Sequence, residues 1–208
     1  MSRRENLIPF LLAAVLTTVP LVVLLLLVFW PESYYEDSTR APKWLKDLCR
    51  AETEPCRRWT EIVIHHSAGD QGDLRLINRY HRDKRRWQSA GYHFIIGNGT
   101  LSGDGEVEVC PRWLDQQDGS HCRGHNHTAI GICLIGNFEL ADETPSQVQL
   151  LSLAQLTAYL SLRYDIPSEC IYLHREVEGA LTLCPGKNFP VREFFALEEA
   201  IADDYRPR

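Results

Sequence analysis

Three residues far apart in the chain, His65, His174 and Cys184, carry side chains of the kind that zinc accepts as ligands. They lie in the segments IVIHHS, LHREV and TLCPG. Two imidazoles and one thiolate leave the fourth position of a tetrahedral zinc ion open for water, and an open position permits catalysis. A fourth protein ligand would instead indicate a purely structural site. The chain therefore has the ligands of a catalytic zinc centre if its fold brings these residues together.

The two histidines lie in segments with the pattern of β-strands. The segment 61–66 is short and rich in β-branched side chains, which predicts a buried strand. The segment 171–174 predicts a second strand, which carries His174 at its end. Because neighbouring residues of a strand point to opposite faces, His65 and His66 cannot both face one metal ion. One of these two histidines is therefore expected to be a bystander.

Strand and helix patterns alternate through the chain after residue 59. Short apolar or β-branched runs predict strands, and apolar residues recurring every three to four positions predict helices. Strands interleaved with helices give an α/β fold with a central mixed β-sheet flanked by helices. The predicted strands are 61–66, 91–96, 107–110, 129–136 and 171–174. Two helices are predicted over 73–87 and 191–205. A third is predicted to begin at Thr144 as its N-cap, with Pro145 in its first turn and Gln147 completing a capping box.

The helix predicted over residues 73–87 carries a histidine and a basic run. His81 shares an apolar face with Leu74 and Ile77, which favours a core histidine over a metal ligand. The basic run 82–86 favours a solvated helix face. With a net charge of −6, the chain has no basic domain to neutralise phosphates, so no nucleic-acid partner is expected.

Residues 7–30 are apolar and uncharged, and as a helix they would reach roughly 30–36 Å, enough to cross a bilayer core. Arg3 and Arg4 precede this run, so the positive-inside rule leaves the short N-terminus in the cytoplasm. A cleaved signal peptide is the alternative, but its apolar core would normally be about 7–15 residues with a cleavage site after it. The favoured organisation is a cytoplasmic N-terminus (1–6), a single transmembrane signal anchor (7–30), an extracytoplasmic tether with a short helix around Leu45 (31–58), and a C-terminal domain on the periplasmic or cell-wall side (59–208).

The chain has seven cysteines, and outside the cytoplasm cysteines can be oxidised. If Cys184 is set aside as a ligand, the remaining six allow 15 complete pairings, so the spacing alone does not give the connectivity. The favoured local pairs are Cys49 with Cys56 and Cys110 with Cys122.

Four motifs, IVIHHSA, SAGYHFIIG, GSHCRGHNHTAIGICLIGNFE and LHREVEGALTLCPGKNFP, together resemble zinc-dependent N-acetylmuramoyl-L-alanine amidases, the type that includes phage lysozyme-amidases and the peptidoglycan recognition proteins. The resemblance covers roughly residues 59–197. It implies one zinc ion per chain, held by His65, His174 and Cys184. It also implies hydrolysis, by a zinc-activated water, of the amide between the lactyl group of N-acetylmuramic acid and L-alanine in peptidoglycan.

The resemblance also implies roles for residues around the metal. Tyr92 matches a catalytic tyrosine, whose phenol can donate a hydrogen bond to a developing oxyanion, a contact worth roughly 3 kcal/mol. Thr182 stands where phage enzymes carry lysine and recognition-protein amidases threonine, so its stabilisation of an oxyanion is expected to be weaker than that of lysine. Cys133 stands where some related amidases carry a glutamate base, and a free thiol is expected there. His121 and Asn126 match loop positions that line the peptide groove in relatives.

Two other functions compete with hydrolysis. Some members of the family bind muropeptides without cutting them, so a membrane-anchored peptidoglycan sensor is the main alternative. Non-catalytic relatives typically lose the cysteine ligand, whereas this chain keeps the three ligands and the tyrosine. A zinc peptidase of another design is not favoured, because the sequence has no His-Glu-x-x-His helix.

Overall fold

The computed structural model of the chain describes Leu45, Asp47 and residues 59–140 and 142–206. The predicted anchor (7–30), most of the predicted tether and the predicted Cys49–Cys56 pair lie outside these residues. Within the described part of the chain, no helix is long and apolar enough to cross a membrane. Leu45, expected in a short helix, is helical and buried.

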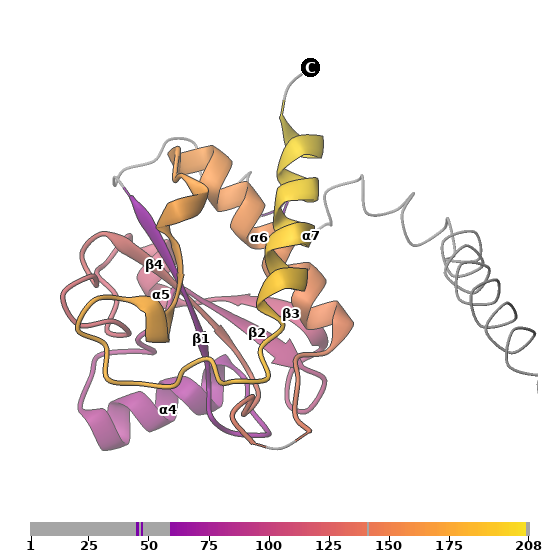
Figure 1. Cartoon of the computed structure of the whole chain (residues 1–208). Helices are drawn as coiled ribbons and strands as arrows, with labels where there is room; N and C mark the ends of the chain where they lie inside the picture. The colour runs from indigo at the N-terminus through magenta and orange to yellow at the C-terminus, as the bar shows by residue number, and fades with distance from the viewer. Residues whose placement is uncertain (1–44, 46, 48–58, 141, 207–208) are drawn as a thin grey trace, which may run out of the picture. The chain divides into compact units, whose positions relative to one another are not determined.

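A five-stranded mixed sheet forms the centre of the fold, as the sequence predicts, with the strand order β3-β2-β4-β1-β5 (Figure 1). β4 pairs in parallel with β1 and β2, and β5 pairs in parallel with β1. β2 and β3 form the predicted antiparallel hairpin, but β3 begins three residues earlier than expected. The strands are β1 Glu61–His66, β2 Phe94–Asn98, β3 Asp104–Val109, β4 Ala129–Leu134 and β5 Ile171–Leu173.

Two successive rows of side chains across the sheet face opposite sides, because side chains alternate along each strand. The apolar row consists of Phe94, Ile132, Ile64 and Leu173, which pair across β2, β4, β1 and β5. All four of these residues are fully buried. The site row, one residue further along the strands, consists of Ile95, Cys133 and His65. The alternation that makes one face a core therefore also gives the other face a buried histidine and a buried thiol.

Helices cover the two faces of the sheet (Figure 1). α6 (Gln147–Tyr164) packs on β2, β3 and α7 (Val191–Tyr205). On the other side, Leu74 and Ile77 of α4 (Leu74–Arg85) pack against the cluster that contains Ile95 and Cys133. Shorter elements are α5 (Pro111–Leu114) and the 3₁₀ turns η1 (Ser168–Cys170) and η2 (His174–Glu176).

The start of α6 differs from the predicted cap. Ser146, not Thr144, is the N-cap, and its hydroxyl accepts the Gln149 N–H while the Gln149 side chain accepts the Ser146 N–H. The Gln149 amide also donates to the carbonyls of Ile96 and Ile135 at the end of the sheet. Thr144 and Ser146 each have a glutamine three residues later, and the structure uses the second pair, whose glutamine also bonds the end of the sheet.

The predicted Cys110–Cys122 disulfide is wrong, because both cysteines are free and buried. Cys110 packs in the cluster with Ile95 and Cys133, whereas Cys122 packs in a separate cluster with Val63 and Ala129. Buried free cysteine behaves as a small apolar residue, and here the two thiols fill different parts of the core.

Candidate metal centre

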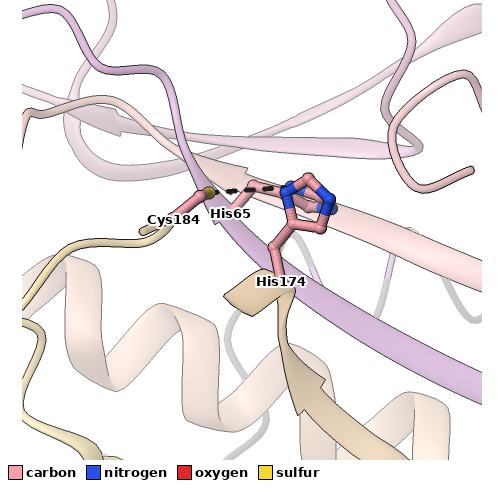
Figure 2. A group of neighbouring side chains, drawn as sticks. All are labelled: His65, His174 and Cys184. Carbon is pink, nitrogen blue, oxygen red and sulfur yellow. Dashed lines mark hydrogen bonds between the residues drawn. The ribbon is translucent and has the colours of Figure 1, made fainter. Parts of the chain in front are cut away.

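The fold brings the three predicted zinc ligands together at one end of the sheet (Figure 2). His65 lies near the end of β1, and His174 follows β5, the strand that pairs in parallel with β1. Cys184 lies in the loop that leads to α7. One ligand atom from each residue lies within 4.8 Å of the other two. Parallel pairing therefore brings two histidines that are more than a hundred residues apart in the chain to neighbouring strand ends.

The backbone around Cys184 fixes the position of its sulfur. The Cys184 carbonyl accepts the Arg175 N–H at 2.8 Å, which ties the cysteine loop to the turn that carries His174. The backbone N–H of His66 donates to Cys184 Sγ at 3.3 Å. The Arg175 guanidinium donates to the Gly186 carbonyl at 2.6 Å and so holds the loop beyond the cysteine as well.

These donors fit a zinc ion. Cys184 Sγ lies 3.8 Å from His65 Nδ1. Tetrahedral zinc with usual N and S bond lengths separates such a pair by about 3.5 Å. His65 is 2% exposed, while His174 and Cys184 are partly buried, so the protein does not fully enclose the three side chains. The three residues therefore form an incomplete tetrahedral set.

The electrostatics of the ligands favour neutral imidazoles. Burial lowers the pKa of His65 well below 6.5, and the neighbouring imidazoles of His121 and His174 lower it further. Burial also lowers the pKa of His174. Burial raises the pKa of Cys184 to about 12, against the opposing effects of the His66 N–H and of Arg175. A metal that binds here therefore meets two imidazoles with available lone pairs and must displace one thiol proton.

Tyr92 lies beside the ligand set. Its ring centroid is 5.3 Å from that of His65, and its hydroxyl lies near the Cys133 thiol. Burial and the nearby thiols raise the pKa of Tyr92 well above 10. Burial likewise raises the pKa of the Cys133 thiol, which is free, as the sequence predicts. The phenol therefore keeps its proton at neutral pH and can donate a hydrogen bond into the site.

His81 is the core histidine that the sequence predicts, and it supports Tyr92. It is 8% exposed, and its Nδ1 accepts the N–H of Gly91 at 3.0 Å. Its ring packs near those of Trp87 and Tyr92, at centroid distances of 4.7 and 5.7 Å.

Of the other predicted site residues, Thr182 and Asn126 hold loops in place. The Thr182 hydroxyl accepts the Cys184 N–H at 3.1 Å, which shapes the turn before the cysteine. The Asn126 Oδ1 accepts the N–H groups of His121 and Cys122 at 2.8 and 2.9 Å. His121, predicted as a substrate contact, has its Nδ1 only 3.1 Å from Nε2 of His65.

The sequence motifs do not reveal two of these features. His66 is the predicted bystander: its ring turns to the Phe138 backbone N–H, but its own backbone N–H supports Cys184. The contact between His121 and His65 joins a loop to a strand 56 residues away. Spacing in the sequence carries no signal for either contact, because both depend on how the loops fold over the sheet.

Comparisons with known proteins agree with this geometry. Residues 55–187 match the model of the Amidase_2 family, described as N-acetylmuramoyl-L-alanine amidase. The chain is 32% identical to the endolysin of Escherichia phage T7, over 69% of this chain and 89% of the phage protein. It is 33% identical to peptidoglycan-recognition protein SC2 of Drosophila melanogaster, over 70% of this chain and 78% of that protein.

Solved structures show the same fold. The endolysin LysCS from Clostridium intestinale, titled an N-acetylmuramoyl-L-alanine amidase, matches with a TM-score of 0.53 and 34% identity, over 67% of this chain and 83% of that one. The bumblebee recognition protein PGRP-SA matches with a TM-score of 0.52 and 22% identity, over 65% of this chain and 80% of that one.

Proposed function

Because this chain belongs to the Amidase_2 family of N-acetylmuramoyl-L-alanine amidases, we propose that it hydrolyses the amide between the lactyl group of N-acetylmuramic acid and L-alanine in peptidoglycan. The observation that carries this proposal is the convergence of His65, His174 and Cys184 beside Tyr92. Three ligands with a neighbouring hydrogen-bond donor suit hydrolysis of an amide better than a closed structural site would.

Zinc is the proposed cofactor, one ion per chain. When bound by three protein ligands, zinc lowers the pKa of water to about 7 and polarises a carbonyl. The chain supplies two neutral imidazoles and a thiol whose sulfur already accepts the His66 N–H. Burial raises the pKa of the Cys184 thiol to about 12, and that N–H and the Arg175 guanidinium offset the rise only in part, so a bound metal must displace the thiol proton.

Tyr92 is the proposed catalytic hydrogen-bond donor. As amide hydrolysis proceeds, negative charge develops on the carbonyl oxygen, and a preorganised donor stabilises that charge. The raised pKa of Tyr92 keeps its hydroxyl protonated, and its packing against the sheet holds the ring in place. Thr182 is proposed as a weaker contributor, since its hydroxyl carries no charge and also accepts the Cys184 N–H.

Some related amidases use a glutamate as the general base on the strand that corresponds to β4, and this chain has no carboxylate at that position. Cys133 occupies the corresponding position, and burial raises its pKa well above 9, so its thiol stays protonated at neutral pH. We assign no proton-accepting role to Cys133. Its contact with Tyr92 makes it part of the support of the phenol.

We also propose that the chain acts outside the cytoplasm, held to the cell membrane by residues 7–30. Support for this comes from the sequence alone: the run is apolar and uncharged, and the arginines lie before it. Peptidoglycan lies on that side of the membrane, so the anchor would place the domain next to its substrate.

A muropeptide sensor that does not cut its ligand is the alternative, favoured by the similarity to peptidoglycan-recognition proteins. The complete ligand set and Tyr92 support hydrolysis over binding alone. His121 and Asn126 remain proposed groove residues in either case.

Digestion of purified peptidoglycan by the full chain in detergent tests the proposal. Wild type is compared with Cys184→Ser and with the matched control Cys170→Ser, whose cysteine lies in η1 away from the site. Intact stem peptides that begin with L-alanine, identified by mass, are expected from wild type and the control but not from Cys184→Ser. Binding of peptidoglycan without any released peptide, by all three proteins, would establish the sensor instead.

A further inference from the structure

The two ring nitrogens of His65 face different partners. Nδ1 lies 3.8 Å from Cys184 Sγ and so belongs to the ligand set. Nε2 lies 3.1 Å from Nδ1 of His121, on the other side of the ring. A metal-ligating histidine usually donates its second ring N–H to a carboxylate, a carbonyl or water. Here that place is taken by a second imidazole.

The partner of the second ring nitrogen of His121 determines which nitrogens of the two rings carry hydrogens. His121 Nε2 is 3.2 Å from the backbone carbonyl of Ala129, which can only accept a hydrogen bond. Nε2 of His121 therefore carries the hydrogen, and Nδ1 of the neutral ring has a lone pair. That lone pair accepts the Nε2–H of His65, and His65 is left with its own lone pair on Nδ1, facing Cys184. One carbonyl on β4 thus sets the tautomer of both rings.

The structure leaves a fitted space for the His121 ring. A side chain at Gly131 of β4, or at Gly119 in the loop, would overlap the imidazole. The backbone N–H of His121 is held by Asn126 Oδ1 at 2.8 Å. The ring is therefore fixed by the sheet below, by the loop beside it and by hydrogen bonds at both nitrogens.

We propose that His121 is a positioning residue for the metal centre: it orients His65 and holds it in the tautomer whose Nδ1 binds zinc. This inference rests on the metal centre of the proposed function and goes beyond it, because it gives a residue of the polar loop a role in metal affinity. A residue that only contacted substrate would leave metal affinity unchanged when replaced.

Zinc affinity, measured by competition with a chromogenic chelator, tests the proposal without reference to hydrolysis. Full-length metal-free protein in detergent is compared as wild type, His121→Ala, His121→Asn and His127→Ala. His127 is the matched control in the same loop, since its side chain is 80% exposed and faces Asp118. Loss of such an orienting partner typically weakens metal binding about 10–100-fold, and that loss is expected for His121→Ala.

The asparagine variant shows whether zinc affinity depends on a hydrogen-bond acceptor for His65 or on the size of the side chain at position 121. Its side-chain oxygen can stand in for Nδ1 and accept the His65 Nε2–H, so His121→Asn is expected to retain most of the wild-type affinity. His127→Ala is expected to bind zinc as wild type does.

The outcomes separate this inference from the proposed function. Wild-type zinc affinity in His121→Ala, with weaker peptidoglycan binding, would overturn the positioning role and leave the metal centre standing. Failure of wild type to bind one zinc ion would overturn the metal centre itself, and this inference with it.

A second measurement covers the case in which His121→Ala fails to fold. Long-range ¹H–¹⁵N spectra of the histidine rings in zinc-loaded wild type are expected to show both His65 and His121 protonated at Nε2. A hydrogen on Nδ1 of His121 would contradict the proposed direction of the hydrogen bond and overturn the inference.

Discussion

The apolar row and the site row lie one residue apart along the same strands, yet they are built from different chemistry. Each residue of the apolar row is a fully buried hydrocarbon side chain. The site row replaces two such side chains with Cys133 and His65, and His65 has polar partners at both nitrogens. The difference shows that alternating side chains along a strand can both stabilise a fold and build a site. The apolar row stabilises the fold, and because that fold is rigid, the site row holds its polar groups in fixed positions.

The largest expected effect comes from removing His65, the proposed zinc ligand in the site row. His65→Ala should abolish stoichiometric zinc binding and lower the rate of peptidoglycan hydrolysis by more than about 10²–10³-fold, the usual cost of losing a single stabilising donor. Metal content and released stem peptides measure the two effects. Wild-type hydrolysis by a zinc-free variant would contradict the role of the site row.

Tyr92→Phe should affect hydrolysis while leaving zinc binding unchanged. The variant keeps the ring that packs on the sheet and loses only the hydroxyl, so the rate should fall about 10²–10³-fold. Initial rates on peptidoglycan, together with zinc affinity, check this. A lower zinc affinity with an unchanged rate per bound zinc would assign Tyr92 to metal binding instead.

The buried histidine of α4, His81, should make the stability of the folded protein sensitive to acid. Burial, with Arg85 and Arg112 nearby, lowers the pKa of His81 to about 4, whereas the unfolded chain has the ordinary value near 6.5. The unfolded state therefore binds more protons between these values, and the stability that neutral His81 contributes is present above pH 6.5 and is lost as the pH falls towards 4.

Denaturant unfolding of zinc-free protein across this pH range measures that loss. In wild type the free energy of unfolding should fall more steeply than in His81→Gln, by at most about 1.4 kcal/mol per pH unit for one proton. Equal slopes in the two proteins would mean that His81 does not contribute.

The smallest effect is expected from the apolar row. Ile132→Val removes one methylene from a fully buried side chain and should cost about 0.5–1.5 kcal/mol of stability. Zinc affinity and hydrolysis should stay at the wild-type level. A large fall in zinc affinity would show that the two rows are coupled more tightly than their opposite orientation indicates.

Much of the fold could be predicted from the sequence because its signals are local. β-branched runs and helical periodicity predict the sheet and the main helices, and the four motifs single out the three candidate metal ligands that the fold brings together. His81 could be recognised as a core residue from its place on an apolar helix face. Each of these predictions depends on residues close together in the chain or on a pattern shared with a family.

The remaining features depend on tertiary contacts. The local sequence offers capping boxes at both Thr144 and Ser146, and the Gln149 of the second one also bonds the end of the sheet. The pairing of Cys110 with Cys122 was wrong because proximity in sequence does not show that the two thiols pack in different clusters. The contact of His121 with His65 arises only when the loop folds over β4.

X-ray absorption at the zinc edge of the full-length, zinc-loaded protein tests the proposed metal centre most directly. The expected first shell contains two imidazole nitrogens at about 2.0–2.1 Å, one sulfur at about 2.3 Å and one further oxygen. A shell without sulfur, or one with two or more sulfurs, would contradict a centre built from His65, His174 and Cys184.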